Sequence, residues 1–327
     1  MTRTIAFLLF AAAVLACAAA ALAQTNWQVT PGPVFTVGPA RAWDGGEIQM
    51  GGVVQVRATE HVGDHFLMVY SAHRAQAPGH GANSLGMATS SDGIGWTRYA
   101  GNPVLGPECR GPCLLYDPKD AAAPYKLWYG TWRQDGATDL RCATSSDGLH
   151  WKAAGIALKR GGPGSYDEDT INHPAIAKVG VTYYLYYDAI NKAGARRICV
   201  ATSSDALNWT KVGPVLESAG GAAWDSKVGD PEVAYRDAKF LMFYKGIAPP
   251  GTQGITEQLG FATSTDGLTF TRYAGNPVLS PSADPKAFPT GQAYGPSVVW
   301  DGSVLQVWFG GPNAAKVTGF FHAVSKP

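Results

Sequence analysis

Five short aromatic-rich segments recur along the chain and predict buried β-strands. They read HFLMVYSAH, YKLWYGTW, TYYLYYDA, KFLMFYKG and LQVWFGGP. Short runs of β-branched and aromatic residues between Gly, Pro and Asp are typical of strands covered on both faces. The pattern therefore predicts an all-β protein.

A second motif, ATSSDG or a close variant, follows four of these segments. Its aspartates are spaced by 55, 58 and 61 residues and are Asp92, Asp147, Asp205 and Asp266. A period above 50 residues indicates a propeller blade with long loops. Asp and Ser at such positions bond to the local backbone and Gly accepts a positive φ, so we expect turns here rather than catalysis.

Each aromatic segment is preceded by a short apolar strand that starts at Gly or Pro. The five starts are Gly52–Val54, Pro112–Leu114, Pro174–Ile176, Pro231–Val233 and Pro296–Val298. They predict a five-bladed β-propeller in a single domain over residues 24–327. The first strand of each blade would line a central channel.

The last blade lacks a fourth strand, because the chain ends soon after Phe320–Val324. The segment Trp27–Phe35 repeats the aromatic, Gly-Pro and Val pattern of Trp209–Leu216. We expect this N-terminal strand to complete the last blade and close the ring, which removes an open sheet edge.

The N-terminus carries an export signal. An apolar stretch from Ile5 ends in the small-residue pattern Ala21-Leu22-Ala23. This predicts a signal peptide over residues 1–23, a secreted or periplasmic protein, and no transmembrane segment in the mature chain. Lipid anchoring through Cys17 is the alternative.

The composition bears on the binding partners and on disulfide formation. Net charge is +1, with 26 basic and 25 acidic residues and no basic run, which disfavours nucleic acid and anionic membranes. Aromatics at 11% suit sugar stacking, but sheet cores explain them equally well. Cys109, Cys113, Cys142 and Cys199 remain after signal removal, and the close pair Cys109 and Cys113 is the expected disulfide.

Candidate site residues lie near the starts of the first strands, where a propeller brings them together. An aromatic–Asp pair recurs in three blades, which favours a structural and a functional role equally. The pairs are Trp43-Asp44, Tyr166-Asp167 and Trp224-Asp225. Asp169, His173, Asp230 and Glu232 instead break the repeat, which favours function. We expect His173 to bond substrate or to transfer a proton.

Carboxylates gathered in one channel suit glycoside hydrolysis, in which one group activates water or attacks and another protonates the leaving group. The predicted catalytic residues are Asp44, Asp169, Asp230 and Glu232. The predicted substrate-binding residues are Trp43, Arg110, Asp167, His173, Trp224, Asp225 and Tyr294. We predict no protein metal site among them.

With its strand starts, aromatic second strands and A-T-S-S-D-G-x-x-W turns, the sequence resembles the five-bladed propeller glycosidases. These include the arabinanases and β-xylosidases of glycoside hydrolase family 43 and the invertase relatives. The resemblance spans residues 27–324 and implies a carbohydrate substrate. The family's first-blade acid is absent, because Met50-Gly51-Gly52 stands there, and only Asp230-Pro231 keeps the Asp-Pro start. We therefore expect Asp44 as base and Asp230 or Glu232 as acid.

Two other functions compete with a glycosidase. A carbohydrate-binding propeller without catalysis is favoured by the missing first-blade acid. A sialidase would need an arginine triad, and Arg110 alone is a poor match. No nucleotide cofactor motif is present, so we expect no cofactor. A calcium ion bound by the carboxylates of the channel is the alternative, although the sequence contains no defined calcium loop.

Overall fold

The computed structural model describes residues 27–56, 66–75, 83–132, 138–252, 254–281, 291–301, 304–312 and 318–325. Its secondary structure is all β, with no helix in these ranges. None of the described residues forms a helix of the length and hydrophobicity that a membrane span requires. The predicted signal peptide and Cys17 lie outside the described residues.

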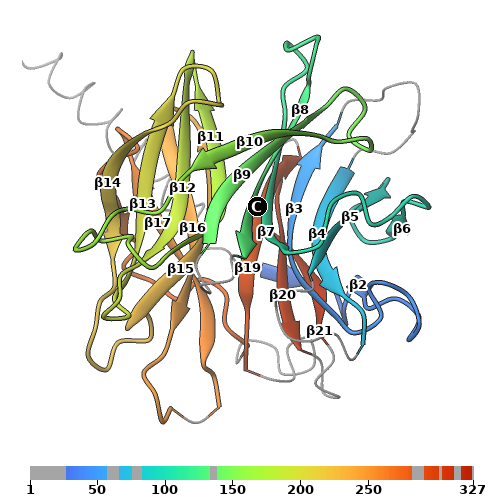
Figure 1. The fold of residues 1–327 in the computed structure, drawn as a ribbon. Helices are drawn as coiled ribbons and strands as arrows, with labels where there is room; N and C mark the ends of the chain where they lie inside the picture. Colours follow the sequence, from blue (N-terminus) through green and yellow to red (C-terminus); the bar gives the residue numbers. More distant parts are fainter. Residues whose placement is uncertain are drawn as a thin grey trace, which may run out of the picture.

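Four units each contain four strands that pair antiparallel in sequence order (Figure 1). The second and third units are joined into one eight-stranded sheet by a parallel pairing of Thr170 with Thr138. Unit 1 is β3 (Glu47–Gln55), β4 (Phe66–His73), β5 (Ser84–Ser90) and β6 (Thr97–Arg98). Unit 2 is β7 (Cys109–Tyr116), β8 (Tyr125–Trp132), β9 (Thr138–Ser145) and β10 (Lys152–Leu158). Unit 3 is β11 (Thr170–Val179), β12 (Thr182–Ile190), β13 (Arg196–Ser203) and β14 (Thr210–Glu217). Unit 4 is β15 (Lys227–Arg236), β16 (Lys239–Ile247), β17 (Glu257–Ser264) and β18 (Thr271–Arg272).

Unit 5 combines the two ends of the chain. It contains β19 (Tyr294–Asp301), β20 (Val304–Pro312) and β21 (Thr318–Ser325), together with β1 (Trp27–Val29) and β2 (Phe35–Thr36). β1 pairs antiparallel with β21, with Trp27 opposite Ser325, and β2 pairs with the same strand. The N-terminal segment is thus the outer strand of the last unit, as its sequence predicts.

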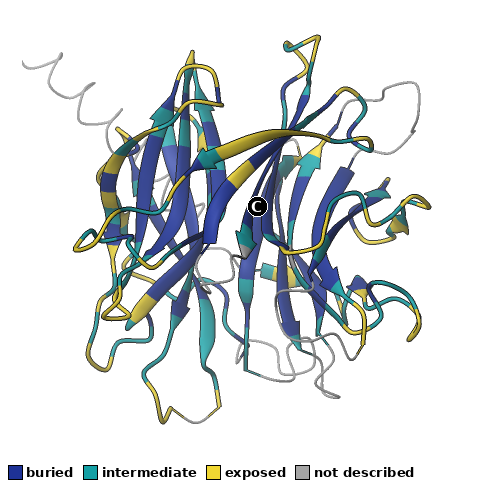
Figure 2. Ribbon diagram, in the orientation of Figure 1, coloured by how far each residue is buried: buried dark blue, intermediate teal, exposed yellow. Residues whose placement is uncertain are grey.

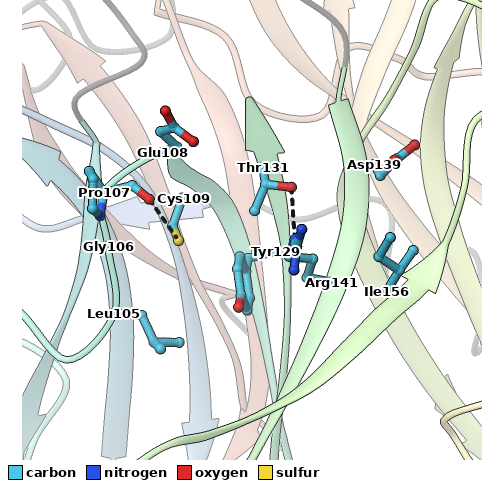
Figure 3. Close-up of a pocket in the computed structure, with 10 residues that line it drawn as sticks. All are labelled: Leu105, Gly106, Pro107, Glu108, Cys109, Tyr129, Thr131, Asp139, Arg141 and Ile156. Atoms are coloured by element: carbon cyan, nitrogen blue, oxygen red, sulfur yellow. Dashed lines mark hydrogen bonds between the residues drawn. The ribbon is translucent and has the colours of Figure 1, made fainter. Parts of the chain in front are cut away.

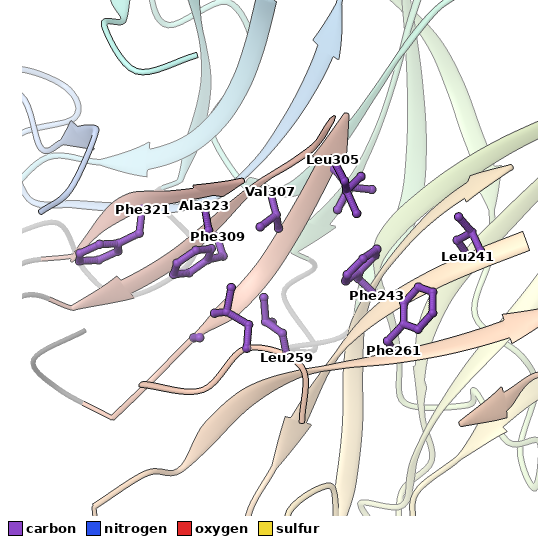
Figure 4. Packing of buried hydrophobic residues seen from close by; sticks show 12 residues of the cluster. Leu241, Phe243, Leu259, Phe261, Leu305, Val307, Phe309, Phe321 and Ala323 are labelled. Atoms are coloured by element: carbon purple, nitrogen blue, oxygen red, sulfur yellow. The ribbon is translucent and has the colours of Figure 1, made fainter. Parts of the chain in front are cut away.

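The first strands of the units contact one another in chain order, from β3 to β7, β11, β15 and β19, and β19 contacts β3 in turn. Five hydrophobic clusters each join two successive units. One of them packs Phe243 and Phe261 of unit 4 near Phe309 and Phe321 of unit 5 (Figure 4). Another joins unit 5 to unit 1.

The second strands are almost wholly buried, as their aromatic sequences predict. Every residue of β4 from Phe66 to Ala72 is buried, and β16 and β20 follow the same pattern. Figure 2 shows the strands mainly in the buried colour, with exposed residues in the turns and along β10. Burial on both faces is therefore confirmed.

The ATSSDG aspartates form turns, which confirms the structural interpretation. Asp92 Oδ1 accepts hydrogen bonds of 2.8 Å from the backbone N–H groups of Ile94 and Gly95. The same pair of bonds recurs at the other three copies.

The disulfide prediction is wrong, because all four described cysteines are buried free thiols. Cys109 and Cys113 lie on the same strand, β7, four residues apart. An extended strand separates such Cα atoms by roughly 13 Å, whereas a disulfide requires less than about 7 Å. Burial raises the pKa of the Cys109 thiol to about 12.

Candidate active site at the inner-strand bulges

The first strands of units 2 to 5 share a bulge at the residue before their proline. This residue has a left-handed backbone in each case. The four are Gly111 (φ 52°), His173 (φ 47°), Asp230 (φ 47°) and Gly295 (φ 55°). The conformation is free for glycine but costs roughly 1–2 kcal/mol for other residues. Bulges of this kind are frequent beside active sites, so the two strained side chains mark the candidate site.

His173 joins two carboxylates from different units. Its Nδ1 donates a hydrogen bond of 2.9 Å to Asp188 Oδ2 on β12 and also lies 2.9 Å from Asp230 Oδ1. One nitrogen carries one hydrogen, so Asp230 Oδ1 is left buried without a hydrogen-bond donor. Burial lowers the pKa of His173, but the two carboxylates outweigh it and the net pKa is raised.

Asp230 is fully buried and held by a lysine. Its Oδ2 lies 2.8 Å from Lys245 Nζ and accepts a hydrogen bond of 3.1 Å from the Gly295 backbone N–H. Its own backbone N–H donates to Asp188 Oδ1 at 2.7 Å. Burial raises the pKa of Asp230, but Lys245 and His173 dominate and hold it well below its ordinary range. We therefore expect this carboxyl to be ionised at neutral pH.

His173, Asp188, Asp230 and Lys245 are called the bulge cluster below. Further charges surround it. Arg196 Nη1 lies 3.9 Å from Asp188 Oδ2, and Glu257 Oε1 lies 3.8 Å from Lys245 Nζ. Burial lowers the pKa of Arg110, which lies near both aspartates of the cluster. The signs alternate, which offsets the cost of burying each charge.

Glu232 lies two residues beyond Asp230 in an uncharged environment. It accepts hydrogen bonds from Val298 N–H at 3.2 Å and Ser297 Oγ at 3.4 Å. Burial raises its pKa to about 7. The same register position in the other first strands holds only small side chains, namely Gly52, Cys113, Ala175 and Ser297. Glu232 is thus an acid that is half protonated at neutral pH.

The predicted residues Arg110, His173, Asp230 and Tyr294 come together in the structure. Tyr294 lies beside the cluster, with Lys245 Nζ 5.9 Å from its ring centre, and its raised pKa reflects burial and then nearby Glu47. Asp169 is exposed, and its carboxylate accepts a hydrogen bond from Thr170. A catalytic role for Asp169 is not supported by these surroundings.

Asp44, Asp167 and Asp225 lie instead in three carboxylate braces. Each brace joins an Asp before the first strand to a Tyr of the second strand and a basic residue of the fourth strand in one unit. The sets are Asp44/Tyr70/Arg98, Asp167/Tyr187/Lys211 and Asp225/Tyr244/Arg272.

Asp44 Oδ2 accepts hydrogen bonds from the Tyr70 hydroxyl at 3.1 Å and from Arg98 Nε at 2.7 Å, and these contacts favour a structural role over the predicted role as base. Trp43 and Trp224 pack on the brace tyrosines, with ring centres 5.5 and 5.8 Å apart. The five predicted residues Trp43, Asp44, Asp167, Trp224 and Asp225 therefore connect strands within single units.

Asp188 and Lys245 were missed because they lie on the buried second strands. An alignment of the five second strands in the sequence would have identified both residues. At one position the five units read Ser71, Gly130, Asp188, Lys245 and Gly310, so two charges replace small residues. Departure from the repeat marks the cluster here as it does at His173 and Asp230.

The bulge cluster can also hold a metal ion. One ligand atom each from His173, Asp188 and Asp230 lies within 4.8 Å of the others, the one such group among the described residues. An imidazole with two carboxylates suits zinc, manganese or iron better than calcium, which prefers six to eight oxygen ligands.

The comparison with solved structures confirms, at the level of the fold, the resemblance to glycoside hydrolases. A glycosyl hydrolase from Bacteroides ovatus matches 93% of this chain and 94% of its own at TM-score 0.72 and 18% identity. A thermostable family-43 glycoside hydrolase matches 89% and 91% at TM-score 0.63 and 17% identity.

A third solved structure has a different chemistry. An N-acetylgalactosamine deacetylase from F. plautii matches 91% of this chain and 95% of its own at TM-score 0.69 and 17% identity. By sequence, an uncharacterized protein of Mycobacterium tuberculosis is 26% identical over 193 residues, which is 55% of this chain and 60% of that protein's length. No protein-family model matches the sequence.

Proposed function

We propose that this protein is an exported glycoside hydrolase that acts on oligo- or polysaccharide at the bulge cluster. The observation that carries the proposal is the contrast between two carboxyl groups on β15. Asp230 lies in a network of ion pairs and stays ionised, whereas Glu232 lies among uncharged groups and keeps a proton near neutral pH. Opposite environments for two acids are how glycosidases divide the acid and anion roles.

In this mechanism Glu232 is the general acid. Its proton passes to the glycosidic oxygen as the bond to the anomeric carbon breaks, and the leaving alcohol departs neutral. The positive charge that develops on the sugar is stabilised by the ionised Asp230. Water then bonds to the anomeric carbon and gives its proton to the Glu232 carboxylate, which restores the acid. Because Lys245 and His173 lower the basicity of Asp230, we assign it this electrostatic role before that of base. Arg110, His173 and Tyr294 provide donors for sugar hydroxyls.

The same proposal includes the architecture. We infer that the five units are blades of a propeller and that β1 closes its ring through β21. The contact of β19 with β3 and the hydrophobic cluster that joins unit 5 to unit 1 support this arrangement. Export rests on the sequence of residues 1–23 alone.

A second candidate is metal-dependent hydrolysis, such as removal of an acetyl group from an amino sugar. The mutual approach of His173 Nδ1, Asp188 Oδ2 and Asp230 Oδ1 favours it, as does the lack of a donor for the last of these. A divalent cation bound there would polarise a carbonyl oxygen. Asp230 would then use Oδ1 toward the metal while Lys245 holds Oδ2.

The test is release of reducing sugar or chromogenic aglycone from arabino-, xylo-, fructo-, galacto- and mannosides by wild type, Glu232→Gln and Asp230→Asn. Glu217→Gln is the control, because that glutamate is exposed on β14. Turnover lost in both site variants and kept in the control supports the glycosidase. Acetate release from N-acetyl sugars that EDTA abolishes supports the second candidate. Binding without either activity identifies a carbohydrate-binding protein and overturns both.

A further inference from the structure

Unit 2 contains a pocket that is separate from the bulge cluster (Figure 3). Its volume is about 310 Å³. It is lined by the chain before β7, by β8 and β9, and by β10, through Leu105, Gly106, Pro107, Glu108, Cys109, Tyr129, Thr131, Asp139, Arg141 and Ile156. Figure 3 shows Tyr129, Thr131 and Arg141 between the Pro107 loop and the Ile156 strand.

The strand register shows what fills this place in other units. Tyr129 is opposite Arg141 in the β8–β9 pair, as Tyr70 is opposite Gly86 in unit 1 and Tyr244 is opposite Gly260 in unit 4. In unit 1 the space above the glycine is occupied by the indole of Trp43, since a Cβ on Gly86 would lie 2.6 Å from it.

Unit 4 repeats this arrangement closely. A Cβ on Gly260 would lie 2.6 Å from Trp224, and one on Gly246 would lie 2.1 Å from the same ring. Gly246 is the counterpart of Thr131 in the strand register. The residues that contact the tryptophan in unit 4 therefore correspond to residues that line the pocket in unit 2.

Unit 2 lacks two features of the braced units, namely the aromatic–Asp pair before the first strand and the basic residue of the fourth strand. The chain before β7 reads Leu105-Gly106-Pro107-Glu108, with no aromatic–Asp pair. The basic residue of the fourth strand, Arg98 in unit 1, is replaced by Ala153 in the same register. The pocket is thus the space that an aromatic ring and a carboxylate occupy elsewhere in the molecule.

The residues that line the pocket suit a ligand that carries both a ring and a carboxylate. A flat ring can lie against Tyr129 in the manner of the brace tryptophans. Arg141 Nε donates to Thr131 Oγ1 at 3.3 Å, and the rest of the guanidinium fork is suited to a carboxylate. Glu108 and Asp139 also line the pocket, and their charges disfavour multiply charged anions. Asp139 Oδ1 already accepts from the Arg160 backbone N–H at 3.0 Å, so Glu108 is the acceptor that we assign to a ligand hydroxyl.

We propose that this pocket binds a carboxylate carried on a ring, with the carboxylate at Arg141 and the ring against Tyr129. A uronic acid unit of an acidic polysaccharide and an aromatic carboxylic acid share this chemistry. The proposal does not depend on catalysis at the bulge cluster.

Isothermal titration calorimetry with D-galacturonate, D-glucuronate and 4-hydroxycinnamate tests the site. Acetate supplies the charge without a ring, and glucose supplies the ring without a charge. We expect saturable binding of at least one ring carboxylate, at least tenfold tighter than acetate or glucose. Uronates alone assign a sugar site, and 4-hydroxycinnamate alone assigns an aromatic-acid site.

Variants connect that binding to the pocket. Arg141→Gln should weaken it at least tenfold, and Thr131→Trp should abolish it by filling the space. Lys152→Gln removes an exposed charge on β10 outside the lining and should stay within twofold of wild type. Absence of saturable ring-carboxylate binding, or equal affinity in Arg141→Gln, overturns the proposal. If Arg141→Gln does not fold, Thr131→Trp and the ligand comparison still decide it.

Discussion

Asp225 and Asp230 lie five residues apart in unit 4 and are both buried, yet they belong to different kinds of site. Asp225 contacts Tyr244 and Arg272, both in its own unit. Asp230 contacts His173 of unit 3 and Gly295 of unit 5 as well as Lys245. Repeated residues make contacts within a unit, whereas residues that break the repeat make contacts between units.

This difference favours a structural role for the aromatic–Asp pairs, including Asp44, which the sequence predicts as a base. A brace needs the same three groups wherever a unit is fastened, so it recurs. A reacting centre is built once from several units, and each unit contributes a different group. Recurrence therefore indicates architecture, and departure from the repeat indicates chemistry.

The largest expected effect comes from Glu232. Glu232→Gln removes the proton donor while keeping size and hydrogen bonding, so kcat should fall at least about 10³-fold, a general-acid contribution of typical size. Glu217→Gln should change kcat less than twofold. A Glu232→Gln enzyme with wild-type kcat would remove Glu232 from the mechanism.

His322 is another residue that breaks the repeat, and it lies on β21, the strand that pairs with the N-terminal strand β1. It replaces the apolar residues of the other third strands and bonds Thr30 on one side and Gln306 on the other, each at 2.9 Å. Burial lowers its pKa to about 4, so the unfolded chain binds a proton more readily than the folded one between about pH 6.5 and 4.

Stability should therefore fall as pH drops through that window, by up to about 3 kcal/mol. His322→Met should remove this part of the acid sensitivity, as measured by urea unfolding at pH 7 and pH 4.5. An unchanged difference between the two pH values would contradict the assignment.

The braces should affect stability and not catalysis. Asp225→Asn removes a charge that faces Tyr244 and the partly exposed Arg272, and we expect a loss of about 1.5–3 kcal/mol of unfolding free energy with kcat/KM within twofold of wild type. Asp44→Asn is the matched variant in unit 1. A large loss of kcat in either folded variant would return that aspartate to the active site.

The last prediction concerns the pH dependence of the wild-type enzyme. As the general acid, Glu232 must be protonated, so activity should fall about tenfold per pH unit above its pKa of about 7. Because burial raises this pKa in the folded state, its stabilising contribution is complete below about pH 4.5 and is lost as pH rises through 7. A flat kcat/KM between pH 6 and 9 would contradict this role.

Periodicity alone predicted most of the fold. The ATSSDG turns, the buried second strands and the use of residues 27–36 as the outer strand of unit 5 all follow from patterns that repeat in the sequence. Hydrogen-bonded turns and short aromatic strands are local properties, so a single repeat is sufficient to indicate them.

The candidate site could be predicted only in part. Arg110, His173, Asp230 and Glu232 stand out because they interrupt the repeat near the strand starts. Asp188 and Lys245 lie within aromatic strands, and whether a buried charge has partners depends on groups from neighbouring units. The disulfide was mispredicted for a related reason, because sequence proximity gives no Cα separation until the strand is known.

The sequence by itself determined the strand content, the repeat and the residues that depart from it, because these depend only on the order of residue types along the chain. The tertiary structure decided which carboxylates are braces and which form the bulge cluster, and it opened a pocket where unit 2 lacks an aromatic–Asp pair. Those outcomes depend on distances between side chains that are far apart in the sequence, because charge pairing and desolvation act through space and not along the chain.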